Sequence, residues 1–160
     1  MDTISEERLS QVHPTLAGKI RQMADILASD DPPTTLRVTQ GLRTWSEQAV
    51  LYAQGRSAPG RVVTNAEPGS SWHNFGLAVD VVPLDLQHLP DWNTSHPIWQ
   101  RIVSVGTGLG LVAGAQFRTF VDYPHFQLTG KWPASPDLEV RETYGQSGIG
   151  GIWNNSGLDA

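Results

Sequence analysis

One carboxylate in an apolar segment constrains this chain more than any other feature of the sequence. Residues 77–82 read Leu-Ala-Val-Asp-Val-Val, so Asp80 interrupts a run that is otherwise typical of a buried strand. A bare carboxylate is costly to bury, and Asp80 therefore needs a charged or hydrogen-bonded partner. An arginine would serve, but a metal ion would also account for a histidine that stands nearby in the sequence.

That histidine, His73, lies seven residues before Asp80 in the segment Ser-Trp-His-Asn-Phe-Gly-Leu-Ala-Val-Asp over residues 71–80. Gly76 allows the chain to bend between the two, and Ala78 leaves room beneath a metal ion. A loop histidine and a strand carboxylate at this spacing can therefore face one another. Taken alone, His73 is more simply explained as a hydrogen-bonded surface imidazole.

A second histidine, His125, follows Asp122 by three residues in Asp-Tyr-Pro-His-Phe. With His73 and Asp80 it would provide two imidazoles and a carboxylate, the ligand set of a catalytic zinc site that keeps one position open for water. Asp122 could then take a proton from that water and pass it to a leaving amine. The structural alternatives are a core histidine for His125 and a turn-capping carboxylate for Asp122.

No other residues of the sequence stand out as metal ligands. The chain has no cysteine, so any metal must be held by imidazole and carboxylate groups. His13, His88 and His96 have no supporting acids around them, and we expect them not to be ligands.

Four further polar residues are candidates for contact with a substrate. Arg43 lies between a predicted strand and a capped helix, where it could stabilise the oxyanion formed when water attacks a peptide carbonyl. A surface ion pair explains Arg43 equally well. Gln48 and Gln40 are weaker candidates, and Ser71 could bond a ligand side chain, a substrate or its own loop.

The order of the predicted elements indicates an α+β fold, with helices packed on a small, mostly antiparallel sheet. We expect helices over 4–12, 14–29, 44–54, 97–108 and 136–144, and strands over 35–40, 77–82, 111–112 and 125–128. In the fourth helix, Gly106 and Gly108 are expected to end the element. Residues 1–160 form one predicted metallohydrolase domain with its core at about 14–144, and residues 154–157 are expected to fray.

Charge and hydropathy exclude several classes of partner. The formal charge is −5, from 11 basic and 16 acidic residues, and without a basic run this disfavours nucleic acid. No apolar run is long enough to cross a bilayer. The first seven residues have neither a cationic region nor an apolar core, which predicts synthesis in the cytoplasm without a signal peptide. We expect a monomer.

The pattern Ser71-x-His73-x-x-Gly76-x-Ala78-x-Asp80, followed by Asp122-x-x-His125, resembles the zinc peptidases that cleave D-amino-acid-containing peptides of bacterial cell walls. This family includes D-alanyl-D-alanine carboxypeptidases and dipeptidases and L-alanyl-D-glutamate endopeptidases. The chain looks most similar to the endopeptidase branch, which includes phage endolysins. The similarity covers about residues 40–136 and departs from many members at 111–117, Leu-Val-Ala-Gly-Ala-Gln-Phe, before the last motif.

The resemblance implies a set of roles. His73, Asp80 and His125 would bind Zn²⁺, Asp122 would be the general base and then the acid, and Arg43 would contact the substrate or the oxyanion. The implied fold is the α+β one shared with the hedgehog signalling domain. The implied substrate is the peptidoglycan stem peptide, cut at the L-Ala–D-Glu bond. With no signal peptide expected, the protein would act on the wall after release, as a phage or prophage lysin does, or would reach it by a non-classical route.

Two alternative functions remain open at this point. A D-alanyl-D-alanine carboxypeptidase or dipeptidase would use the same zinc chemistry with a pocket of different shape. A zinc-stabilised wall-binding module would keep the ligands without catalysis, but the presence of Asp122 argues against it.

Overall fold

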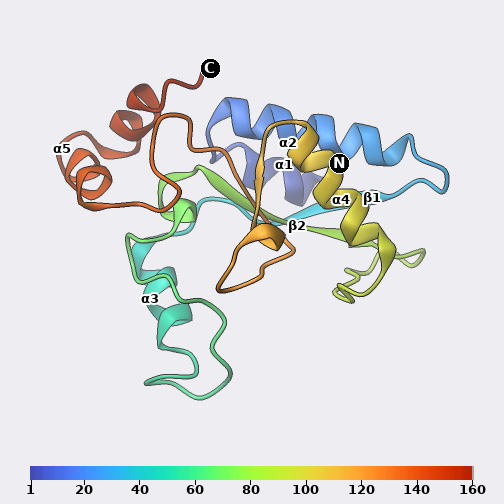
Figure 1. Cartoon of the computed structure of the whole chain (residues 1–160), viewed down its shortest axis with the longest axis horizontal. Helices are drawn as coiled ribbons and strands as arrows, with labels where there is room; N and C mark the ends of the chain where they lie inside the picture. The colour runs from blue at the N-terminus through green and yellow to red at the C-terminus, as the bar shows by residue number, and fades with distance from the viewer. Residues whose placement is uncertain (160) are drawn as a thin grey trace.

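The structure, a computed structural model, describes residues 1–159. A four-stranded antiparallel sheet, in the order β1-β2-β4-β3, lies at its centre with helices around it (Figure 1). The predicted α+β class is confirmed. The elements are α1 (Thr3–Leu9), α2 (Pro14–Ala28), β1 (Thr35–Gln40), α3 (Trp45–Ala53), η1 (Trp72–Phe75), β2 (Ala78–Leu84), α4 (Pro97–Gly108), β3 (Val112–Ala113), η2 (Gly114–Gln116), β4 (His125–Gln127) and α5 (Leu138–Asn155).

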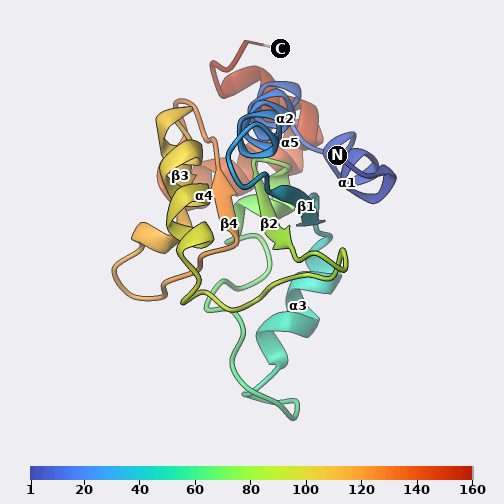
Figure 2. The ribbon, with the colours of Figure 1, turned by 90° about the vertical axis from the view of Figure 1, so that its right-hand side faces the viewer.

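Helices α2 and α4 pack on each other and on one face of the sheet, and together they enclose the main core (Figure 2). Apolar side chains of α2 recur at helical spacing and are fully buried: Leu16, Ile20, Met23 and Leu27. Val79, Val81 and Phe126 meet them from the sheet. One face of β2 and β4 is therefore committed to packing.

Gly106 sets how closely α4 approaches the sheet. A Cβ atom at this position would lie 2.3 Å from Cε1 of Phe126 in β4, so only glycine fits. The helix ends at Gly108 as predicted, and Gly106 lies within its last turn, where its carbonyl accepts from Leu111 N at 3.0 Å. The close approach fixes the strand that carries His125.

Helix α1 lies along β1, and Asp2 joins the two elements. Its carboxylate caps α1 by accepting from Ser5 N at 2.9 Å and pairs with Arg37 Nε of β1 at 2.6 Å. Burial works to raise the pKa of Asp2, but the hydrogen bonds from Ser5 and the Arg37 guanidinium outweigh it and lower the pKa to about 2.

The C-terminal region differs from the sequence prediction. Instead of a short helix over 136–144 with a frayed end, α5 extends to Asn155 across a kink at Gly148, and Ser156 is fully buried. Tryptophans hold it: Trp153 Nε1 donates to Phe75 O at 2.8 Å, and Trp132 Nε1 donates to Ile152 O at 2.9 Å. These contacts build a second, aromatic cluster between α5 and η1.

The other predicted elements lie close to their expected bounds. The strand over 35–40 is confirmed, and α3 begins after a capping box in which Thr44 and Glu47 bond each other's backbone N–H groups. Within residues 1–159, every helix is too short or too polar to serve as a membrane span.

Candidate active site and metal centre

The register of two neighbouring strands places Asp80 directly opposite His125. β2 and β4 are antiparallel, and the pairs are Ala78 with Gln127, Val79 with Phe126, and Asp80 with His125. Side chains alternate between the faces of a strand, so Val79 and Phe126 enter the core while Asp80 and His125 share the opposite face. One face of β2 and β4 thus packs in the core, and the opposite face carries Asp80 and His125.

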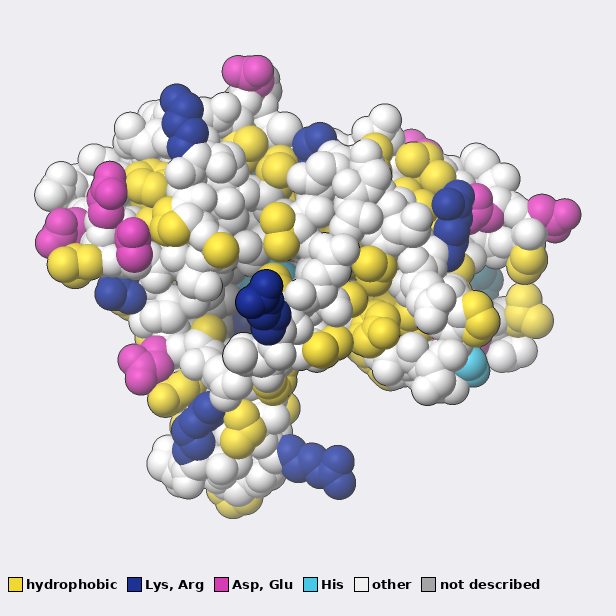
Figure 3. All heavy atoms as spheres, viewed as in Figure 1, with side chains coloured by type: hydrophobic (Ala, Val, Ile, Leu, Met, Phe, Trp, Pro, Cys, Tyr) yellow, Lys and Arg dark blue, Asp and Glu magenta, His cyan; other side chains and the backbone are white. Residues whose placement is uncertain are grey.

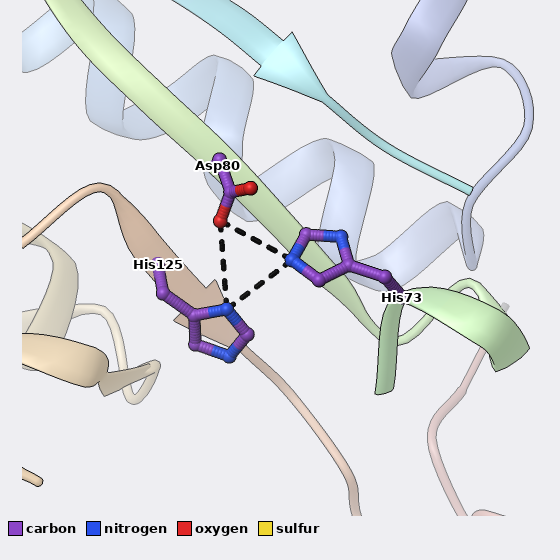
Figure 4. Close-up of side chains that lie close together, drawn as sticks. All are labelled: His73, Asp80 and His125. Carbon is purple, nitrogen blue, oxygen red and sulfur yellow. Dashed lines mark hydrogen bonds and ion pairs between the residues drawn. The ribbon is translucent and has the colours of Figure 1, made fainter. Parts of the chain in front are cut away.

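His73 reaches the same place from η1. Ser71 Oγ accepts from His73 N at the start of this short helix, and Gly76 ends it in the left-handed region at φ 65°. His73 Nε2 lies 3.2 Å from Asp80 Oδ1 and 3.2 Å from His125 Nδ1, while His125 Nδ1 lies 3.5 Å from Asp80 Oδ1 (Figure 4). The three side chains predicted to converge do so.

The outer nitrogen of each imidazole is bonded to a carbonyl oxygen, which can only accept. His73 Nδ1 donates to Gly41 O at 2.9 Å, and His125 Nε2 donates to Gln127 Oε1 at 2.9 Å. Gln127 Nε2 in turn donates to Ala134 O at 2.9 Å, which fixes the orientation of its amide. In the neutral rings, the inner nitrogens are then lone pairs that face Asp80, so the group can hold a metal ion.

Charge within the group follows from its burial and its partners. Burial disfavours the ionised form of Asp80, but the imidazoles of His73 and His125 outweigh it and hold the pKa of Asp80 well below its ordinary value. Burial of the His125 ring disfavours the imidazolium, but the Asp80 carboxylate outweighs it and raises the pKa of His125. The ionised form of Asp80 is thus favoured beside the two rings.

Arg43 lies against the outer oxygen of Asp80. Its Nη2 donates to Asp80 Oδ2 at 3.4 Å, its Nη1 donates to Gln48 Oε1 at 3.0 Å, and its buried Nε has no partner within residues 1–159. Backbone bonds fix the residue as well, since Arg43 N donates to His73 O at 2.9 Å and Asn74 Nδ2 donates to Arg43 O at 2.9 Å. The guanidinium is therefore held beside His73, Asp80 and His125, the three possible metal ligands that are called the metal group below.

Asp122 precedes β4 and lies half-buried beside the group. Its backbone N–H donates to Gly114 O at 3.0 Å, and within residues 1–159 its carboxylate takes part in no hydrogen bond. Burial, and after it the charge of Asp80, raises the pKa of Asp122 above its ordinary value, against the opposing influence of His125, His73 and Arg43. Asp122 is a free carboxylate with an increased affinity for a proton.

These residues line a cleft of about 770 Å³. In the view of Figure 3, basic side-chain atoms stand near the centre of this face of the molecule, in front of histidine atoms. Ser71 lines the cleft, as expected for a substrate contact. The structure places Gln40 and Gln48 elsewhere: Gln40 Nε2 donates to Leu42 O at 3.3 Å, and the buried Gln48 bonds Arg43 and, at 2.8 Å, Ala66 O.

Sequence reasoning missed Gln127, Asn74 and the residues of the cleft wall. Gln127 could have been found, because it lies two positions after His125 in a strand and therefore shares its face. Asn74 and the wall carry no comparable signal, since their roles arise from contacts with loops distant in the sequence.

Comparisons with known proteins identify the family of this chain. The family model described as D-alanyl-D-alanine carboxypeptidase matches residues 64–128. Peptidoglycan L-alanyl-D-glutamate endopeptidase CwlK of Bacillus subtilis (strain 168) is 33% identical in an alignment 129 residues long, and the match covers 74% of this chain and 74% of the relative.

Solved structures share the fold. The L-Ala D-Glu endopeptidase ChiX of Serratia marcescens has a TM-score of 0.59 at 27% identity, with 81% of this chain and 89% of that chain covered. The LD-carboxypeptidase LdcB has a TM-score of 0.56 at 22% identity, with 93% and 77% covered. The chain therefore belongs to the metallopeptidase family that includes D-alanyl-D-alanine carboxypeptidases and L-alanyl-D-glutamate endopeptidases.

Proposed function

We propose that the protein is a zinc-dependent peptidoglycan peptidase that cleaves the stem peptide at the bond between L-alanine and D-glutamate. The observation that carries this proposal is the convergence of His73, Asp80 and His125, with the outer nitrogens of both rings bound to carbonyl oxygens. The activities named for CwlK and ChiX support the choice of bond.

The donor set and its dimensions fit zinc. A zinc ion bound by nitrogen and oxygen at about 2.0–2.1 Å in tetrahedral geometry separates its ligand atoms by about 3.3 Å. The three separations here are 3.2, 3.2 and 3.5 Å. His73 Nε2, Asp80 Oδ1 and His125 Nδ1 would hold the ion. Bound there, it would supply Lewis-acid chemistry, polarising a peptide carbonyl and making water a better nucleophile near neutral pH.

Asp122 would move the proton. Its carboxylate has no hydrogen-bond partner within residues 1–159 and lines the cleft beside the metal ligands. The raised pKa of Asp122 favours transient proton uptake, first from the attacking water and then on to the nitrogen of the leaving amine. The same residue would thus act as general base and then as general acid.

Arg43 would stabilise negative charge on the substrate carbonyl oxygen. Only two of its guanidinium nitrogens have partners within residues 1–159, Gln48 and Asp80, and the side chain lines the cleft. A preoriented cation is worth most where charge develops in a site that excludes water. Gln48 would contribute by holding Arg43, whereas Ser71 is proposed to contact the substrate directly. Gln40 stays a prediction with its side chain directed to Leu42.

The proposal is tested by digesting purified cell walls and identifying the products by mass spectrometry. Release of stem peptides that begin with D-glutamate, abolished by a chelator and restored by zinc, is the expected result. The family description favours a second candidate, a carboxypeptidase, which would instead remove a terminal D-alanine. Binding to walls without turnover would identify a non-catalytic module and would contradict both enzymatic proposals.

We also propose that the protein works as a monomer and meets its substrate outside the cytoplasm. Sedimentation of the purified protein would test the first point, since the cleft is lined by residues of a single chain. Lysis of cells from without by added protein, compared with expression inside them, would test the second.

A further inference from the structure

A loop over residues 117–121 forms one wall of the cleft. Phe117 N and Asp122 N both donate to Gly114 O, at 3.1 and 3.0 Å, so one carbonyl closes both ends of the loop. The Phe117 ring lies 5.6 Å from the His125 ring between centroids. The loop therefore starts beside the metal group and ends at Asp122, and in Figure 1 the orange segment that contains it hangs below β2.

Arg118 is the cation of this loop. Its exposed side chain lines the cleft and makes no hydrogen bond or ion pair with any residue of the described chain, 1–159. The other arginine of the cleft, Arg43, is already engaged by Asp80 and Gln48. Arg118 is thus the positive side chain of the cleft that is free to meet a ligand.

An acidic substrate would gain from such a cation. Asp80 is already paired with Arg43 and the two imidazoles, but the unpaired carboxylate of Asp122 lines the same cleft and repels an anionic peptide at the distances found within a binding site. A D-glutamyl residue has two carboxyl groups of which the peptide chain uses one, so the other stands as an anion next to the scissile bond. A guanidinium matches a carboxylate with two parallel hydrogen bonds.

We propose that Arg118 is a specificity-determining residue that pairs with the free carboxylate of the acidic residue following the scissile bond. This inference rests on the proposed function and adds the feature of the substrate that the 117–121 loop selects. Because Arg118 stands at the exposed side of the cleft, the pair contributes to binding of the substrate and leaves the metal group unchanged.

The test compares two synthetic peptides that contain the L-alanyl-D-glutamyl bond, one with a free carboxylate and one with that carboxylate amidated. Wild-type protein is expected to favour the free acid. Arg118→Gln should lower kcat/KM about tenfold on the free acid, mainly through KM, and should change the amidated peptide little; a tenfold change is about 1.4 kcal/mol. Arg118→Lys should restore part of the preference.

A matched control is Arg61→Gln. Arg61 is exposed, has no partner within residues 1–159 and does not line the cleft, so its replacement removes the same charge elsewhere. It should leave the preference intact. An equal loss on both peptides in Arg118→Gln, or no loss on either, would overturn the role of Arg118 while the wild-type activity still supports the proposed function. Wild-type protein that cleaves neither peptide would overturn the function and this inference with it.

Discussion

The metal group and the 117–121 loop border the same cleft but are held in different ways. His73, Asp80 and His125 stand on η1, β2 and β4, and their polar atoms are bonded to neighbours. The loop is fixed at its ends by Gly114 O, and Arg118 between them has no partner within residues 1–159. The proposed metal ligands thus stand on regular elements. The proposed specificity residue, Arg118, stands on a loop whose sequence can vary without disturbing the metal group.

The largest effect should come from the residue where the two regions meet. Asp122→Asn removes the carboxylate that would carry the proton, and we expect kcat to fall by about 10²- to 10⁴-fold. Zinc content and thermal stability should stay close to wild type, because Asp122 is not among the proposed ligands. Wall hydrolysis and metal analysis would check this. Asp25→Asn, an exposed position on α2, is the control, and unimpaired hydrolysis by Asp122→Asn would exclude it as the base.

The hydrogen bond between Gln127 and His125 should contribute to the affinity of the site for zinc. Gln127→Met keeps the volume of the side chain but removes the oxygen that accepts from His125 Nε2. Outer partners of this kind contribute about 10- to 100-fold to affinity, so zinc should be bound more weakly by that factor. Competition with a chromophoric chelator would measure the constant. Gln127→Glu, which retains an acceptor, should recover part of the loss; equal affinities in all three proteins would contradict the role of Gln127.

A substitution at Gly114 should disturb the point at which both ends of the 117–121 loop are bonded. A Cβ atom there would lie 2.5 Å from Asp122 O and 2.8 Å from His125 Cβ, so Gly114→Ala must displace one of them. We expect a loss of about 1–3 kcal/mol in the free energy of unfolding together with reduced hydrolysis.

Gly18 in α2 is the matched control for that change. No atom lies within 4 Å of a Cβ built there, so Gly18→Ala should raise the free energy of unfolding by about 0.5–1 kcal/mol. Chemical denaturation of both variants provides the measurement. Equal shifts for the two glycines would show that the Gly114 contact is not limiting.

The smallest effect is expected at Asp2, which joins α1 to β1. It tests whether the ionisation of Asp2 changes the stability of the fold without changing hydrolysis in the cleft. The pKa of Asp2 is about 2 in the fold against an ordinary 3.8, so its contribution to stability is present above about pH 4 and is lost as the pH falls through 2. Since the side chain is 31% exposed, screening by solvent limits this contribution to about 1 kcal/mol. Asp2→Asn should therefore lower stability at pH 7 and converge with wild type near pH 2, without changing hydrolysis at pH 7. A gap that persisted at pH 2 would argue against the ionised carboxylate.

Local signals in the sequence predicted much of the scaffold and the metal group. Alternation identified residues 35–40 as a strand, the capping box located the start of α3, and the lone carboxylate in an apolar strand pointed to His73 and His125. Each of these rests on a pattern within about ten residues or on the cost of burying a charge.

What the sequence did not predict depends on contacts between distant segments. The second half of α5 is rich in glycine and has no apolar stripe, and contacts such as the bond from Trp153 to Phe75, 78 residues earlier, hold it in place. Gln48 looked like a substrate contact, yet the fold uses it to hold Arg43. Arg118 carries no sequence signal, because its free charge is evident only once the partners of Arg43 are known.

The proposed metal ligands stand on elements that belong to different hydrophobic clusters, and this affects how cooperatively the protein folds. His73 belongs to η1, whose Trp72 and Phe75 lie in the aromatic cluster with α5, whereas Asp80 and His125 stand on strands whose Val79 and Phe126 lie in the main core. Strand β2 already joins the two clusters, since Ala78 lies in the aromatic cluster and Val79 in the main core, and an ion bound by all three side chains would add a second link. Unfolding of the two clusters would then be coupled more tightly and would depend on the free zinc concentration. The same three side chains would decide how long the folded enzyme persists where zinc is scarce.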